Sequence, residues 1–256
     1  MLTVSHPEVE RRPSTVPPPS IHHSPRSLHT LVNQQVRLWE AHVPGPCAAA
    51  HPQLAHAWPV ITISREAGAG GALLGERLAS LFGFGYWDRQ LLTSISERLG
   101  VDEAELEQVD ERAPNPVSEF LELLMHFGEV PAAEFGDRLR QVVGGLQRRG
   151  AAVIVGRGAH LIVDPLRSLR VRLTAPLEYR VREYASHEGM NLDAARRFLI
   201  DTDRERRTFV QRQFGAKADD PCQYDLVINI QSLGMETALE LVVSAYRRKF
   251  GCLPTG

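Results

Sequence analysis

A glycine-rich stretch is the part of this chain best suited to chemistry on phosphate. Gly68-Ala-Gly-Gly71 follows the apolar run Val60–Ile63 and precedes a helical pattern of leucines. Glycines let the backbone curl so that its N–H groups converge, and the N-terminus of the next helix adds partial positive charge. This order is typical of a phosphate-binding loop. The residues expected to face the phosphates are Gly68, Ala69, Gly70, Gly71 and Ala72.

The loop lacks two side chains of the usual nucleotide-binding pattern G-x-x-x-x-G-K-[ST]. With Gly70 as the second glycine, Arg65 stands at the first glycine, Gly71 at the lysine and Ala72 at the hydroxyl residue. The β- and γ-phosphates therefore lose a cation, and Mg²⁺ loses a hydroxyl ligand. Taken alone, the glycines fit a tight strand-to-helix connection without a ligand as well as they fit a phosphate loop.

Positive charge is available in other parts of the chain. Arginine and lysine total 29, but only Lys217 and Lys249 are lysines, and arginine suits two-pronged contacts with phosphate. A cluster of arginines spans Asp203–Arg207 in a long helical pattern, and Lys217 follows it. The alternative is a solvated helix face with Lys217 as a surface residue. We predict that the phosphate charge comes from Arg65, Arg206, Arg207 and Lys217.

Two further polar residues follow strands. Asp88 comes directly after the short aromatic run Phe84–Trp87, and Arg157 follows the apolar run Ala151–Val155 between two glycines. In an open parallel sheet, ligands bind at the carboxyl ends of the strands, so these side chains are expected at one crevice. The alternatives are that Asp88 caps a helix and that Arg157 covers a helix end.

The elements that must position these residues alternate between strands and helices. Five strands are expected, and the long run among them is apolar throughout, as in a parallel sheet covered on both faces. The alternation predicts a three-layer α/β/α fold with a parallel five-stranded sheet. The expected strands are Val60–Ile63, Phe84–Asp88, Ala151–Val155, Leu169–Leu173 and Asp225–Ile230. The expected helices include Arg89–Leu99, Val101–Val109, Val117–Phe127, Phe135–Arg149, Leu192–Gln213 and Glu236–Phe250.

Composition separates a tail from a domain. Residues 1–57 hold nine of the 17 prolines and seven of the ten histidines, and such sequence buries too little apolar surface to fold. We expect a disordered tail there, with one short helix possible within it, and a folded domain over residues 58–251.

Charge and cysteine spacing limit the environment and the partners. The net charge of −2 gives no general attraction to nucleic acid, and no run approaches the roughly 20 apolar residues of a membrane span. The three cysteines are far apart, which favours a reducing compartment without disulfides. We expect a cytoplasmic protein that binds neither nucleic acid nor membrane; the oligomeric state is not predicted.

Six motifs follow one another in order over about residues 60–250. They are Ile61-Thr-Ile-Ser-Arg-Glu with the glycine loop, Tyr86-Trp-Asp88, Val153-Ile-Val-Gly-Arg157, Leu173-Thr-Ala-Pro-Leu-Glu-Tyr-Arg180, Asp203-Arg-Glu-Arg206 and Tyr224-Asp-Leu-Val-Ile-Asn229. On these motifs the chain resembles the cytidylate kinase-like family of nucleoside monophosphate kinases.

The resemblance implies a phosphate-loop fold with an arginine-rich helical lid, and transfer of the γ-phosphoryl of ATP to CMP or dCMP with Mg²⁺. Asp88 and Arg157 match positions of the monophosphate site, and Arg204–Arg207 match the lid. Active kinases of this kind carry Lys and Ser at Gly71 and Ala72, and Asp at Gly158. The alternative is therefore a nucleotide-binding sensor or scaffold that has lost the transfer reaction.

Overall fold

The computed structural model describes residues 57–88, 92 and 135–254. All but the last residue of the expected tail, and the helices expected between residues 89 and 127, lie outside the described residues.

The described chain is built on one sheet of five parallel strands. The strand order is β2-β3-β1-β4-β5, so β1 lies in the middle and pairs with β3 and β4. This arrangement confirms the parallel five-stranded sheet expected from the sequence. The strands are β1 (Val60–Arg65), β2 (Gly85–Trp87), β3 (Ala152–Val155), β4 (Ser168–Thr174) and β5 (Leu226–Asn229).

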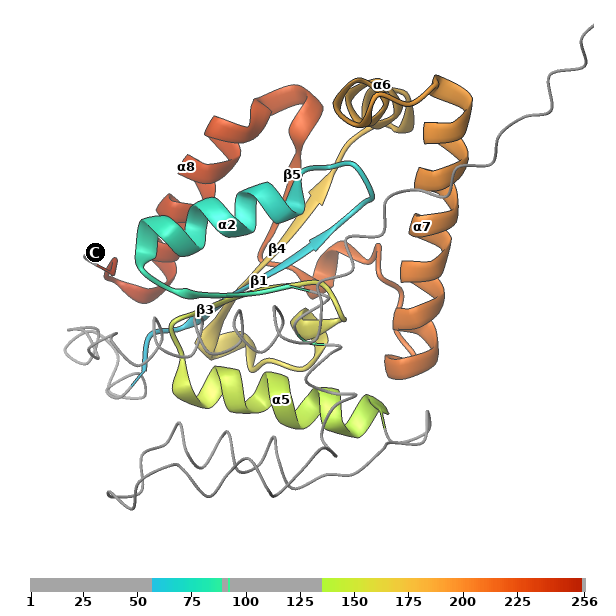
Figure 1. The fold of residues 1–256 in the computed structure, drawn as a ribbon. Helices are drawn as coiled ribbons and strands as arrows, with labels where there is room; N and C mark the ends of the chain where they lie inside the picture. Colours follow the sequence, from blue (N-terminus) through green and yellow to red (C-terminus); the bar gives the residue numbers. More distant parts are fainter. Residues whose placement is uncertain (1–56, 89–91, 93–134, 255–256) are drawn as a thin grey trace, which may run out of the picture.

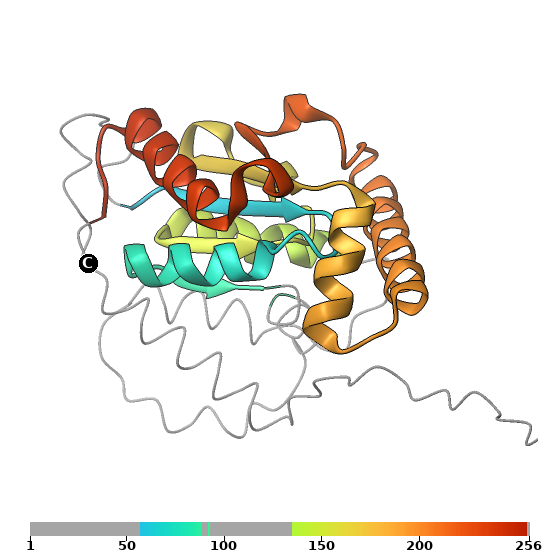
Figure 2. The ribbon, with the colours of Figure 1, turned by 90° about the horizontal axis from the view of Figure 1, so that it is seen from above.

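Helices cover both faces of the sheet and its carboxyl edge. Helices α2 (Gly71–Phe82) and α8 (Ile230–Phe250) lie on one face, and α5 (Phe135–Arg149) lies on the other (Figure 1). Helices α6 (Leu177–Glu188) and α7 (Leu192–Phe214) stand beyond the tips of the strand arrows, which the second view makes clear (Figure 2). The three-layer α/β/α fold is therefore confirmed.

The apolar runs lie in central strands, where helices cover both faces of the sheet. All four residues of β3 are fully buried, as are Val60 and Ile61 of β1. Burial of such side chains stabilises a fold by about 1.5–3 kcal/mol each. On the face of α2 and α8, the ring of Tyr246 packs against those of Phe82 and Phe250, and the Tyr246 hydroxyl donates to the Pro59 carbonyl oxygen at 2.8 Å.

A second, smaller apolar cluster joins the two helices at the carboxyl edge to the glycine loop. It is separate from the main core. Its members are Ala67, Val181, Ala185, Ala195 and Leu199.

The last helix begins earlier in the chain than the sequence predicted, directly after the last strand. Strand β5 ends at Asn229, whose side-chain oxygen accepts from the Gln231 N–H at 3.1 Å and caps a helical turn. Gly234 then takes a non-helical conformation with φ 73°, and the helix continues from Met235. The expected start at Glu236 missed this first turn, because a glycine kink divides it from the longer apolar pattern.

The structure bears on two of the expectations, those about membrane spans and about disulfides. No described helix is long and apolar enough to cross a membrane. Cys222 is a free, exposed thiol, but Cys252 is disulfide-bonded. The expectation of a chain without disulfides is therefore wrong at Cys252.

Candidate functional site

A cavity of about 270 Å³ lies at the carboxyl ends of β1, β3 and β4, against α7. Five arginines and three carboxylates line it. Such a surplus of guanidinium groups favours an anionic ligand. The charged lining residues are Arg65, Arg157, Arg172, Arg206 and Arg207, with Glu66, Asp203 and Glu205.

The glycine loop beside this cavity has the backbone of a phosphate loop. Gly68 and Gly70 have φ values of 77° and 75°, in the left-handed region that glycine adopts without strain. Gly70 is the N-cap of α2 and offers no side-chain oxygen to the first turn. The N–H groups that begin a helix have no partner within it. The loop therefore presents donors at the positive end of the α2 dipole.

The side chain of Arg65 takes up the space beside Gly71. A Cβ atom added at Gly71 would lie 2.7 Å from the Cγ of Arg65, so a side chain there would require the Arg65 stem to move. The same arginine continues to the end of β3, where its Nη1 occupies the space beside Gly156. Arg65 thus runs across the start of α2, from the place where the lysine of the usual loop would begin.

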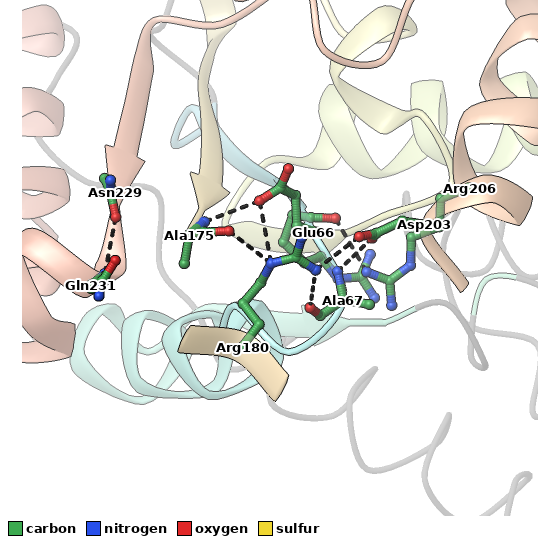
Figure 3. Close-up of polar contacts among 9 residues, drawn as sticks. Glu66, Ala67, Ala175, Arg180, Asp203, Arg206, Asn229 and Gln231 are labelled. Atoms are coloured by element: carbon green, nitrogen blue, oxygen red, sulfur yellow. Dashed lines mark hydrogen bonds and ion pairs between the residues drawn. The ribbon is translucent and has the colours of Figure 1, made fainter. Parts of the chain in front are cut away.

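Arg180 and Asp203 form a buried ion pair that ties α6 and α7 to the glycine loop (Figure 3). The Arg180 Nη1 lies 2.8 Å from the Asp203 Oδ2 and donates at the same distance to the Ala67 carbonyl oxygen. The second oxygen of Asp203 accepts from the Ala67 N–H at 2.7 Å. One loop N–H is therefore already taken by a carboxylate of the chain itself.

Glu66 completes this network from the loop side. Its Oε2 accepts from the Ala175 N–H at 3.0 Å and lies 3.5 Å from the Arg180 Nε (Figure 3). Arg206, one helical turn after Asp203, donates from Nη1 to the Arg65 carbonyl oxygen at 3.2 Å. The arginine-rich helix is thus docked on the loop rather than extended into solvent.

Arg157 reaches the cavity from a strained position after β3. Its φ of 53° is uncommon for a residue with a side chain, and strain of this kind clusters at functional sites. The guanidinium carbon lies 5.6 Å from the Phe135 ring centre and 5.1 Å from that of Phe209. These two rings, from α5 and α7, hold its charge at the cavity wall.

Asp88 follows β2, on the far side of β3 from the cavity, and does not line it. Its negative charge adds to burial in raising the pKa of Tyr86, and Glu76 contributes in the same direction. Asp88 therefore lies close to Tyr86 at the β2 end of the sheet, outside the lining of the cavity.

The other predicted residues divide between two hollows. Arg206 and Arg207 line the main cavity with Arg65 and Arg157. Lys217 is exposed and lines a separate hollow against the outer side of α7, which shares Arg207 and Ala218 with the first. Lys217 makes no ion pair with any described residue. The loop residues Gly68–Ala72 follow Arg65 and Glu66 in the chain but do not themselves line the main cavity.

Sequence reasoning gave no role to a polar cluster in the cavity floor. Ser64, His160, Arg172 and Tyr224 come from four different segments and bond to one another. The available signal was weak: Ser64 and Arg172 are polar residues of two strands, at positions that the sheet places in register.

Within residues 57–88, 92 and 135–254, no group of three or more His, Cys, Asp or Glu side chains is placed to hold a metal ion. Of the three carboxylates at the cavity, Asp203 is bound closely by Arg180, at 2.8 Å. Glu66 lies farther from Arg180, at 3.5 Å, and Glu205 does not pair with it. A protein cage for Mg²⁺ is therefore not formed by the described side chains.

Comparison with known proteins connects this geometry to a family. The family model described as "Cytidylate kinase-like family" matches residues 60–232. A cytidylate kinase from Methanopyrus kandleri is 26% identical over 187 residues, covering 73% of this chain and 92% of the relative. One from Ignicoccus hospitalis is 23% identical over 184 residues, covering 72% and 96%.

A solved structure shares the fold. A crystal structure of a protein from Eubacterium ventriosum superposes with a TM-score of 0.56 at 18% identity, covering 73% of this chain and 98% of that one. At this identity the likeness concerns the fold alone.

Proposed function

The chain belongs to the cytidylate kinase-like family, and we propose that it transfers the γ-phosphoryl group of ATP to a nucleoside monophosphate, with CMP or dCMP as acceptor. Phosphoryl transfer needs little covalent help from a protein; it needs reactants held in line and cations around the phosphoryl oxygens. The cavity at the strand ends is suited to that task, because arginines from four different segments line it.

The observation that carries the proposal is the course of the Arg65 side chain. Its stem fills the space beside Gly71, where the lysine of the usual loop begins, and its head reaches the end of β3. Arg65 would therefore supply the cation that the loop sequence lacks. Arg206 and Arg207 would add charge from α7, and Arg157 would hold the acceptor phosphate. Lys217 lies in the neighbouring hollow and would have to swing around α7 to take part.

The loop residues fit a donor triphosphate in part. The N–H groups at the start of α2 are available to phosphate oxygens, and Gly68–Ala72 would face them. Mg²⁺ is usually bound through one or two carboxylates together with substrate phosphates. Glu66 and Glu205 would be its protein partners at the cavity, and the ion would arrive on ATP, whose charge it would partly neutralise.

Turnover with a panel of nucleotides tests the proposal. Purified protein is incubated with ATP and Mg²⁺ and with CMP, dCMP, UMP, AMP or GMP in turn, and ADP formation is measured. The expected result is diphosphate formation with CMP or dCMP that disappears on chelation of Mg²⁺. Binding of a monophosphate by calorimetry without any turnover would instead support the sensor, which the absence of a loop lysine and hydroxyl also favours.

A further inference from the structure

Arg172 is a buried cation in the floor of the central cavity. It lies on β4 in register with Ser64 on β1, and only 9% of its surface is exposed. Both residues line the cavity. A guanidinium group does not lose its proton in proteins, so the charge persists although it is buried.

No carboxylate of the described segments pairs with this cation. Its Nη1 donates to the Ser64 Oγ at 3.3 Å, and its guanidinium carbon lies 5.6 Å from the Tyr224 ring centre. Among the described residues, no Asp or Glu lies within ion-pair distance of Arg172. Nearby arginines differ, since Arg170 pairs with Asp225 and Arg180 with Asp203.

The polar groups around Arg172 already satisfy one another. The Tyr224 hydroxyl lies 2.7 Å from the Ala218 carbonyl oxygen, which can only accept, so the single phenolic proton goes there. The His160 Nε2 at 3.0 Å and the Ser64 Oγ at 3.2 Å then have to donate to the Tyr224 oxygen. Ser64 accepts from the Arg172 Nη1, and no carboxylate among the described residues accepts from the other N–H groups of Arg172.

His160 adds no second positive charge to the cluster. Burial lowers the pKa of His160 to about 4, and the charges of Arg172 and Arg170 act in the same direction, so its ring is neutral near pH 7. The cluster therefore presents one uncompensated positive charge to a cavity in which arginines outnumber carboxylates.

A buried charge costs free energy unless a counter-charge and hydrogen bonds meet it. We propose that Arg172 forms an oxyanion-binding subsite for a phosphate or carboxylate group, with its guanidinium N–H groups as the donors. The ligand group is assigned to the acceptor substrate, and this assignment rests on the proposed kinase function. The existence of the subsite does not, because it follows from the unpaired cation alone.

Titration with inorganic phosphate tests the subsite without ATP and without turnover. Calorimetry at constant ionic strength compares the wild type with R172M, which keeps the apolar stem, and with R248M, a matched control at an exposed position in the last turn of α8. R248M should bind phosphate as the wild type does. R172M should bind at least about tenfold more weakly, since it loses charge-assisted hydrogen bonds.

Stability separates ligand binding from a structural role. In phosphate-free buffer, R172M should unfold at the same temperature as the wild type or higher, because it no longer buries an unpaired charge. The proposal is overturned if R172M binds phosphate like the wild type, or if it is clearly destabilised in phosphate-free buffer.

Kinetics identify the source of the anion. If the acceptor supplies it, R172M should raise the KM for CMP about tenfold or more with a smaller change in kcat, and phosphate should compete with CMP. If phosphate binding depends on Arg172 but does not compete with CMP, the subsite takes a free anion. If no variant turns over any monophosphate, the kinase function fails while the phosphate titration still decides the subsite.

Discussion

At the scale of single residues, Arg65 is the side chain whose position most changes the expected chemistry. It begins at the end of β1, covers Gly71 and ends beside Gly156. An arginine here brings a planar, permanently charged group with several donors, whereas the usual loop lysine brings a compact point charge. The phosphoryl oxygens would therefore face a planar guanidinium group with several donors rather than a compact ammonium group.

Replacement of Arg65 tests this role. R65M should lower kcat with ATP and CMP on the order of 10³-fold, because arginines aimed at a transferring phosphoryl group contribute about that much. R65K should recover part of the loss. K217A serves as the comparison and should have a much smaller effect, since Lys217 lies in the other hollow. A steep loss for K217A with R65M near wild type would reverse the two roles.

His160 makes stability depend on pH in a defined window. Its pKa is lowered from 6.5 to about 4 in the folded chain, first by burial. Between these values the unfolded chain binds the proton and the folded chain does not, so stability is full above pH 6.5 and falls as the pH drops towards 4. The loss from this residue is about 3 kcal/mol.

Urea unfolding at pH 7 and at pH 4.5 measures this dependence. H160Q should show a smaller difference in the free energy of unfolding between the two pH values than the wild type does. H187Q is the matched control, because His187 is 83% exposed. An equal pH dependence in H160Q and wild type would show that His160 is protonated in the folded chain.

At the scale of elements, the docking of α7 depends on the pair of Asp203 and Arg180. Asp203 is the helix residue that bonds both to Arg180 and to the loop N–H of Ala67. Removing one partner of a buried pair leaves the other charge uncompensated and costs about 3–5 kcal/mol. The helix would lose its polar anchor while its apolar contacts, such as Leu199, remain.

D203N should therefore lower the free energy of unfolding by several kcal/mol. D201N is the control on the same helix, because Asp201 pairs with Arg204 at 3.5 Å on the surface, where such pairs contribute about 0–1 kcal/mol. Thermal or urea unfolding measures both. Similar losses in D203N and D201N would mean that α7 is held by its apolar face alone.

At the scale of the whole molecule, the described chain has two apolar clusters of unequal size. The larger spans the sheet and its covering helices, and the smaller lies between α6, α7 and Ala67. Segments with few buried apolar contacts open at lower free energy than the core. The α6–α7 pair should therefore open without unfolding of the sheet.

Hydrogen exchange followed by mass spectrometry checks this expectation. Peptides from β1, β3 and β4 should exchange last, at the rate set by global unfolding. Peptides from α6 and α7 should exchange earlier, and saturating ATP and CMP should slow them. Exchange of α7 at the same rate as β3 would show one cooperative unit.

Much of the fold was predictable because its signals are local. Ala151–Val155 is apolar throughout, and Phe135–Arg149 carries a helical pattern with the bounds that the structure has. The Arg180–Asp203 pair joins positions 23 residues apart and also reaches Ala67, so only the folded chain reveals it. Arg172 likewise becomes significant only once β4 lies beside Ser64.

The packing of Arg65 against Gly71 has a consequence for how such loops evolve. A lysine introduced at Gly71 would collide with the arginine stem, because its Cβ would lie 2.7 Å from Cγ. An arginine removed first would leave the loop with neither cation. If Arg65 supplies the loop cation as proposed, each single step between the two loop types is worse than either end point, and a lineage with Arg65 keeps its arginine unless both codons change together.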